Sequence, residues 1–363
     1  MEYQEQDYVR ELRQVELSST LPDIRVTGVQ RVRMVVEVDN EPVFDEWLTA
    51  GDTDQVELHD LRDLVEPYAY RRQTVTLRVT ATEEDNTVKL DSTAQVVYCE
   101  ADMGDTVAAD YLQTHFLSIL QGPKLTAPGR LEILPAQGTG AVVTTPGQPG
   151  QLPASTATCT ARYSDGTTQE FSVGVYLQGT HFTEYDASPD NFAATGKTLV
   201  GYTIAVGQRS QDYEIDFSAG DCAPILLFFN SFGVEEVVYC TGKHVVSPTF
   251  KRSMAYVGHH QRNYRIDETR EFRADTGPLT TAMANWLDDL FRSRLVRVAN
   301  VYDGEVTPVR EVVITDSKSE YSNEDDAIPR FTFTYQYAQR NHNVVDLQRA
   351  GRIFDNTFDN TFN

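Results

Sequence analysis

Apolar and polar residues alternate with a period of two along much of this chain. The pattern is clearest at 31–38, at 74–80 and at 331–337, where Phe331, Phe333, Tyr335 and Tyr337 are separated by polar residues. Such alternation is typical of antiparallel strands with one buried and one solvated face. Helical spacing is clear only after Pro278, which predicts a helix over 280–292, and two shorter helices are predicted near 106–120 and 60–68. Few helices among many strands predict a mainly β fold.

The chain has 363 residues, enough for two or three domains. We predict tandem β-sandwich modules at 15–100, 101–243 and 244–343, flanked by an N-terminal arm (1–14) and a C-terminal arm (344–363). A stretch rich in Gly, Pro, Thr and Gln at 135–153 predicts an extended surface loop. It is either flexible or ordered against a neighbouring subunit. The pair Asp303-Gly304 lies between two apolar runs and predicts a hairpin.

Charge limits the classes of partner. The chain carries 54 acidic and 31 basic residues, a formal net charge of −23. This charge repels phosphate and argues against proteins that wrap nucleic acid or bind anionic membranes. The N-terminus has neither a basic nor an apolar region, so we expect no secretory signal. The longest apolar run, around 225–229, is too short to cross a bilayer, and we expect a soluble protein made in a cytoplasm.

Several short patterns resemble parts of known ligand sites but are incomplete. Gly196-Lys197-Thr198 resembles the end of a phosphate-binding loop, but Asn191 replaces the required glycine and a strand pattern follows. Asp186, Ser188 and Asp190 imitate the start of an EF-hand loop that lacks its glycine and its final glutamate; a calcium site of another kind stays open.

The remaining polar patterns predict no chemistry either. His259 and His260 are adjacent, so on a strand they face opposite sides and cannot chelate one metal. The acidic clusters at 83–85 and 324–326 are expected in solvated loops. The chain contains Cys99, Cys159, Cys222 and Cys240 without a zinc-site spacing, which predicts buried free thiols. We predict no catalytic, cofactor-binding or metal-binding residues and no enzymatic activity.

Two segments are candidates for contact with other proteins. The segment 250–273 is locally basic and aromatic, with interleaved acidic residues, which predicts exposed strand faces with cross-strand ion pairs or a subunit interface. The C-terminal arm repeats Phe-Asp-Asn-Thr and carries Phe354, Phe358 and Phe362. Exposed phenylalanines favour an extended tail that docks on a partner.

Two stretches carry a family resemblance. Residues 56–68 read VELHDLRDLVEPY, and residues 226–236 read LLFFNSFGVEE, followed by Tyr239-Cys240-Thr241-Gly242-Lys243. Both resemble segments of structural tail and baseplate proteins from phages and prophages of Bacteroidota gut bacteria. Neither motif is catalytic: Gly233 is expected to form a positive-φ turn and Pro67 to end a short helix. The third module also resembles the tail-tube type of fold, a β-sandwich or barrel with one flanking helix.

The resemblance implies a non-enzymatic virion protein of the tail or baseplate, assembled in the host cytoplasm. We expect a homo-oligomeric ring that docks neighbouring tail proteins, with an acidic lumen through which DNA passes without specific binding. The alternative is a bacterial surface protein, such as a carbohydrate-binding or adhesin β-sandwich. That class typically needs a signal peptide and exposed tryptophans, and this chain has only Trp47 and Trp286. A third alternative, a β-rich hydrolase, requires carboxylates that converge in a deep cleft.

Overall fold

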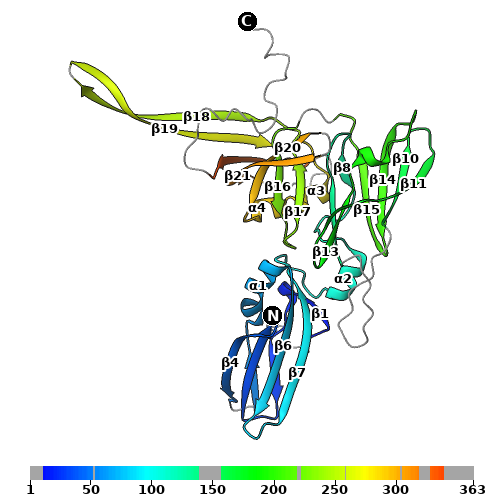
Figure 1. Ribbon diagram of the computed structural model, residues 1–363, viewed down its shortest axis with the longest axis vertical. Helices are drawn as coiled ribbons and strands as arrows, with labels where there is room; N and C mark the ends of the chain where they lie inside the picture. The colour runs from blue at the N-terminus through cyan, green and yellow to red at the C-terminus, as the bar shows by residue number, and fades with distance from the viewer. Residues whose placement is uncertain are drawn as a thin grey trace, which may run out of the picture.

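The computed structural model describes residues 11–51, 54–138, 157–218, 222–257, 259–302, 305–318 and 328–338. It confirms the mainly β fold, with several sheets and short helices (Figure 1). The strands fall into an N-terminal, a middle and a C-terminal module. No helix in these ranges is long and apolar enough to cross a membrane.

The N-terminal module contains a five-stranded sheet in the order β1-β7-β6-β3-β4 and a two-stranded sheet of β2 and β5. Val32, Met34, Val36 and Val38 are buried as the alternation predicts, and they pack against helix α1. Pro67 does not end this helix, because α1 continues to Arg72 with Ala69 fully buried in the core. The elements are β1 (Val15–Leu17), β2 (Ile24–Thr27), β3 (Arg31–Val38), β4 (Glu41–Thr49), β5 (Gln55–Leu58), α1 (Leu61–Arg72), β6 (Thr74–Glu83) and β7 (Val88–Val97).

A linker with helix α2 (Ala108–Thr114) leads to the middle module. The helix predicted over 106–120 is shorter than expected, because the backbone becomes extended at His115 and Leu117 N–H then bonds to the carbonyl of Pro135. Two sheets, β11-β10-β14-β15-β8 and β12-β13-β9, enclose one core. The strands are β8 (Lys124–Thr126), β9 (Ile133–Gln137), β10 (Ala157–Tyr163), β11 (Thr168–Ser172), β12 (Val175–Gln178), β13 (Phe182–Asp186), β14 (Leu199–Val206) and β15 (Arg209–Ile215).

The predicted loop at 135–153 begins inside strand β9, which pairs with β13, so its first residues are not loop. The residues from 139 onward lie outside the described ranges.

The C-terminal module is one seven-stranded sheet, β17-β16-β20-β21-β22-β19-β18, with helices α3 and α4 packed on one face. The predicted helix over 280–292 is present but is divided at Leu287. Tyr302 pairs with Glu305, as the hairpin prediction requires. The elements are β16 (Ile225–Phe229), β17 (Glu235–Tyr239), β18 (Val245–Val257), β19 (His260–Asp275), α3 (Thr281–Trp286), α4 (Asp288–Arg292), β20 (Val296–Tyr302), β21 (Glu305–Lys318) and β22 (Thr332–Tyr337).

The boundary between the middle and C-terminal sheets differs from the module boundary that the sequence predicts. Strands β16 and β17, predicted to close the second module at 243, hydrogen-bond into the C-terminal sheet through β20. Leu226, Phe228 and Val238 pack against α3 and α4 on one face of this sheet, and Leu227 and Val237 pack on the other face against Leu131 and Ile133 of the middle module. These two strands therefore carry apolar residues on both faces, so their sequence pattern does not indicate to which sheet they belong.

Candidate interaction surfaces

The loop between β16 and β17 joins the C-terminal module to the N-terminal one. Asn230 organises the loop, because its side-chain oxygen accepts hydrogen bonds from the N–H groups of Phe232 at 2.9 Å and Val234 at 3.3 Å. Gly233 has φ of 69°, the positive-φ turn that the sequence predicts. A Cβ at this position would lie 3.0 Å from the Tyr98 ring, so glycine also permits close approach. The turn presents Phe232 to the neighbouring module.

Phe232 and Val234 are buried in a cluster built from three parts of the chain. The cluster includes Leu17 and Val97 of the N-terminal module and Tyr111 of the linker helix, whose ring stacks on Phe232 with centroids 5.8 Å apart. We call the loop 230–234 with these contacts the joint. Apolar burial across it fixes the N-terminal module to the rest of the chain.

Residues that follow α1 and β7 also hydrogen-bond to the 230–234 loop at the joint. Gln73, the residue after α1, donates its side-chain N–H to the carbonyl of Gly233 at 2.9 Å. Glu100 N–H donates to the carbonyl of Ser231 at 2.7 Å. The loop 230–234 therefore lies at a contact between modules, where Phe232 and Val234 act in packing.

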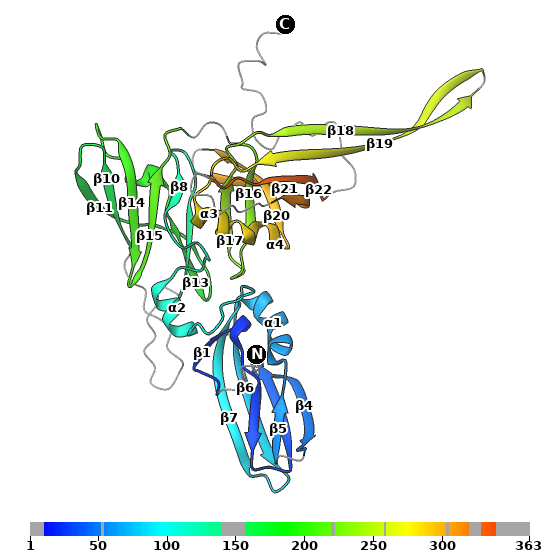
Figure 2. The same cartoon turned by 180° about the vertical axis from the view of Figure 1, so that it is seen from behind.

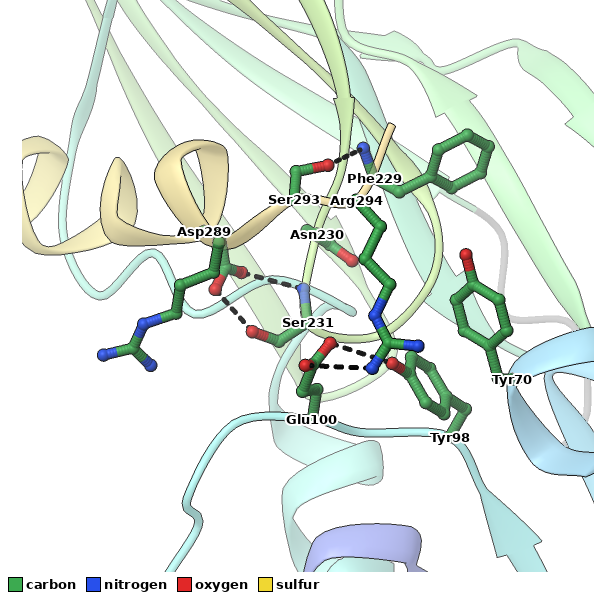
Figure 3. Close-up of a pocket in the computed structure, with 10 residues that line it drawn as sticks. Tyr70, Tyr98, Glu100, Phe229, Asn230, Ser231, Asp289, Ser293 and Arg294 are labelled. Carbon is green, nitrogen blue, oxygen red and sulfur yellow. Dashed lines mark hydrogen bonds and ion pairs between the residues drawn. The ribbon is translucent and has the colours of Figure 1, made fainter. Parts of the chain in front are cut away.

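Polar residues surround the joint on its exposed side (Figure 3). The buried Asp289 carboxylate accepts hydrogen bonds from the backbone N–H of Ser231 at 3.0 Å and from its hydroxyl, and burial raises the pKa of Asp289. Arg294 forms an ion pair with Glu100 at 3.3 Å and lies over the Tyr70 ring at 5.1 Å. The cavity between these side chains, of about 30 Å³, has room for one water molecule. Its size suits a structural contact.

A second contact, between the middle and C-terminal modules, contains a buried ion pair. Lys124 of β8 lies 2.7 Å from Glu132, and both side chains are almost fully buried. The Lys124 ammonium also lies 4.6 Å from the centre of the Trp286 ring, and Trp286 donates its indole N–H to Glu236 at 2.7 Å. Burial raises the pKa of Glu236, which the Lys124 charge partly opposes. The three modules are thus held together by packed contacts.

The β18–β19 hairpin is a long, largely exposed element of the described chain. β22 pairs with β19 only over residues 272–275, and the hairpin extends from there away from the body (Figures 1 and 2). Phe250, Met254 and Tyr256 alternate along β18, and Ile266 pairs opposite Arg252, so these four share one face. Tyr256 is 79% exposed and Tyr264, at a register shift in the ladder, is 71% exposed. Such a face is typical of a binding surface.

The ion pairs of this hairpin differ from the prediction. Arg265 pairs with Asp267, Arg270 with Glu268 and Arg273 with Glu271, and each pair joins residues two apart on β19 rather than residues on opposite strands. Residues two apart lie on the same face of one strand, so their long side chains can meet without a partner on the opposite strand.

A shallow groove lies on the sheet face at the base of the hairpin, with a volume of about 820 Å³. Its lining is mostly polar, from β18, β19, β21 and β22, and includes Arg273, Asp316, Thr334 and Gln336. These groups hydrogen-bond well in water, so a partner in the groove would have to replace those hydrogen bonds.

The predicted interaction residues Phe354, Phe358 and Phe362 lie outside the described ranges.

Strand β14 follows Gly196-Lys197-Thr198 directly, as predicted, and Asp190 accepts hydrogen bonds from the backbone of Gly129. Cys99, Cys159 and Cys240 are buried free thiols as predicted, whereas Cys222 is partly exposed beside Arg130. Within the described ranges no group of three or more His, Cys, Asp or Glu side chains is arranged to hold a metal ion.

The apolar face of the hairpin was not among the predicted site residues. Its alternation resembles that of a half-buried strand, although the basic and aromatic composition of 250–273 predicted exposed strand faces in this segment. No protein-family model matches the sequence, and no curated protein matches it. The function is therefore argued from these surfaces.

Proposed function

We propose that this protein is a non-enzymatic structural subunit of a phage tail or baseplate, and that copies of it assemble into a symmetric ring. The single observation that carries the proposal is the β18–β19 hairpin, which extends beyond its own sheet and exposes large apolar side chains. A surface of this kind is costly in water unless another protein covers it.

The rest of the molecule supports the same role. The joint and the buried Lys124–Glu132 contact hold the three modules as one unit, which a subunit needs in order to transmit a fixed angle to its neighbours. The C-terminal module, one sheet with two short helices on one face, is compatible with the tail-tube type of fold. A net charge of −23 suits the inner surface of a tube through which DNA passes, because that surface would repel the phosphates.

The proposal is tested by the assembly state of the full chain, alone and co-expressed with proteins from neighbouring genes. Light scattering after size exclusion and negative-stain microscopy should reveal rings or complexes. The variant Tyr256→Ser/Tyr264→Ser should weaken assembly, because it removes two exposed aromatic anchors. The control Val88→Ser/Phe217→Ser removes two exposed apolar side chains elsewhere and should assemble normally.

The adhesin alternative makes a different prediction for the same samples. A chain that stays monomeric with all its neighbours and binds oligosaccharides on a glycan array would refute the structural role. The polar groove beside the hairpin would then be the first place to locate the sugar, because its lining offers hydrogen-bond donors and acceptors.

A further inference from the structure

We propose that the β18 edge of the hairpin in one copy docks on the β4 edge of the N-terminal module in a second copy. The inference rests on the proposed function, because it names the partner surface for the exposed hairpin. It depends on three observations: opposite charge, two free strand edges, and the positions of these edges in the molecule.

Strand β18, the turn and the first part of β19 are basic in an acidic protein. Residues 245–266 contain Lys251, Arg252, Arg262 and Arg265 and no Asp or Glu. The rest of the chain therefore has 27 basic residues against all 54 acidic ones. The Lys and Arg side chains share the hairpin with Phe250, Met254 and Tyr256, a combination of Arg, Met and aromatic residues that is enriched at protein interfaces.

The β4 edge has the opposite charge. The segment 37–60 contains no Lys or Arg, and its nine acidic residues are Glu37, Asp39, Glu41, Asp45, Glu46, Asp52, Asp54, Glu57 and Asp60. Within this acidic segment β4 also offers apolar surface, because Trp47 is exposed and Val43 and Phe44 are partly exposed. A basic, aromatic strand is therefore complementary to it in both charge and polarity.

Both strands are edges. In the described chain β4 is paired only with β3, and β18 only with β19. Each therefore has a row of backbone N–H and C=O groups that faces away from its own sheet. The 13 residues of β18 are long enough to pair with all nine residues of β4. Strand addition would satisfy these groups and bring the charged side chains together.

The two edges lie at opposite ends of the molecule, so one copy cannot close the contact on itself (Figure 2). A contact between different surfaces of two copies is head-to-tail, and repetition gives a closed ring when the rotation per subunit closes. This geometry matches the ring of the proposed function. DNA is a less suitable occupant, because the acidic body repels phosphate and the apolar residues of the hairpin would stay exposed.

Charge exchange tests the contact in the full-length chain. The variant Lys251→Glu/Arg252→Glu should raise the dissociation constant of the assembly by about tenfold or more, and Glu41→Lys/Glu46→Lys should do the same. A chain that carries all four substitutions restores opposite charges and should assemble again. A photo-crosslinking amino acid at position 256 should react with residues 41–49 of another copy, as read by mass spectrometry.

A matched control places the same charges elsewhere. Glu170→Lys/Glu214→Lys reverses two exposed strand glutamates of the middle module and should leave assembly unchanged. Circular dichroism before and after heating checks that each variant is folded.

The outcomes separate the two proposals. If the wild type assembles and both charge reversals assemble equally well, or if crosslinks map outside β4, the β18–β4 contact is wrong and the structural role stands. If the hairpin reversal abolishes binding to duplex DNA and leaves assembly intact, the contact is also wrong. A wild type that stays monomeric with every neighbour refutes both.

Discussion

Replacing Phe232 with alanine should uncouple the N-terminal module from the rest of the protein. The ring is only 1% exposed and stacks on Tyr111 of the linker helix. It fills the centre of the cluster that Leu17 and Val97 share with the β16–β17 loop. The substitution removes this contact and leaves the cores of the three modules intact.

The size of the effect follows from burial. Truncation of a buried phenylalanine to alanine costs about 3–5 kcal/mol. The Glu100–Arg294 ion pair on the same joint is more than a third exposed at both side chains, so it contributes less than about 1 kcal/mol. The apolar contact therefore dominates the coupling between the modules. The N-terminal module keeps its own core of buried Val, Leu and Ile residues and should remain folded without it.

Urea unfolding of the two modules measures the coupling. The chain has two tryptophans, and in a Trp47→Phe background the buried Trp286 reports on the C-terminal module. Hydrogen exchange of β6 and β7 reports on the N-terminal module. The two transitions should coincide in the parent and separate in Phe232→Ala. The control Phe217→Ala removes a phenylalanine that is 63% exposed and should change neither. Coincident transitions in Phe232→Ala, shifted by less than about 1 kcal/mol, would refute the reasoning.

Three further predictions concern burial and assembly. Lys124→Met leaves Glu132 buried without its cation, so the free energy of unfolding in urea should fall by about 3–5 kcal/mol. The double variant Lys124→Met/Glu132→Leu should recover most of this loss. Equal stability of the single variant and the parent would contradict the prediction. Burial raises the pKa of Glu184 from 4.5 to about 7, so the folded state holds the proton more tightly and the stability of the parent falls as the pH rises from 4.5 through 7. In urea titrations, the free energy of unfolding of Glu184→Gln relative to the parent should therefore increase by about 3 kcal/mol between pH 4.5 and pH 8. A stability difference that does not change with pH would contradict this. Deleting residues 351–363 should weaken assembly in size exclusion and leave the melting temperature unchanged; unchanged assembly would remove the docking role of Phe354, Phe358 and Phe362.

The strands were predictable because one rule governs them. Alternation assigns each residue of a half-buried strand to a face, and Val32, Met34 and Phe333 are buried accordingly. The fate of Pro67 was not predictable, because α1 continues through it to Arg72 and the packing of the whole helix against the sheet, which includes Val65 and Ala69, is a tertiary contact that the local preference of proline does not reveal. Sheet membership was equally hidden: β16 and β17 are apolar on both faces, and only tertiary contacts assign them to the C-terminal sheet.

The charge of the candidate surface and the exposure of its strands were predictable, but the apolar residues that lie on the exposed face were not. The basic residues of the β18–β19 hairpin are visible in the sequence, as is the acidity of 37–60. The sequence cannot tell that Phe250 and Tyr256 have no sheet opposite them, because their spacing equals that of buried strand residues. Exposure depends on where β22 stops pairing with β19, which is a property of the whole sheet.

In the proposed ring, the joint and the proposed β18–β4 contact are linked through the geometry of the subunit. The β18 and β4 edges belong to different modules, so the angle between successive subunits depends on how rigidly the joint holds these modules. A head-to-tail contact closes into one ring size only when this angle is fixed. Phe232→Ala leaves both edges intact and loosens the angle, so the variant should still associate but form rings and open chains of mixed size. Negative-stain microscopy of parent and variant at equal concentration measures the distribution. A variant that forms rings of the parent's single size would show that the angle is set elsewhere.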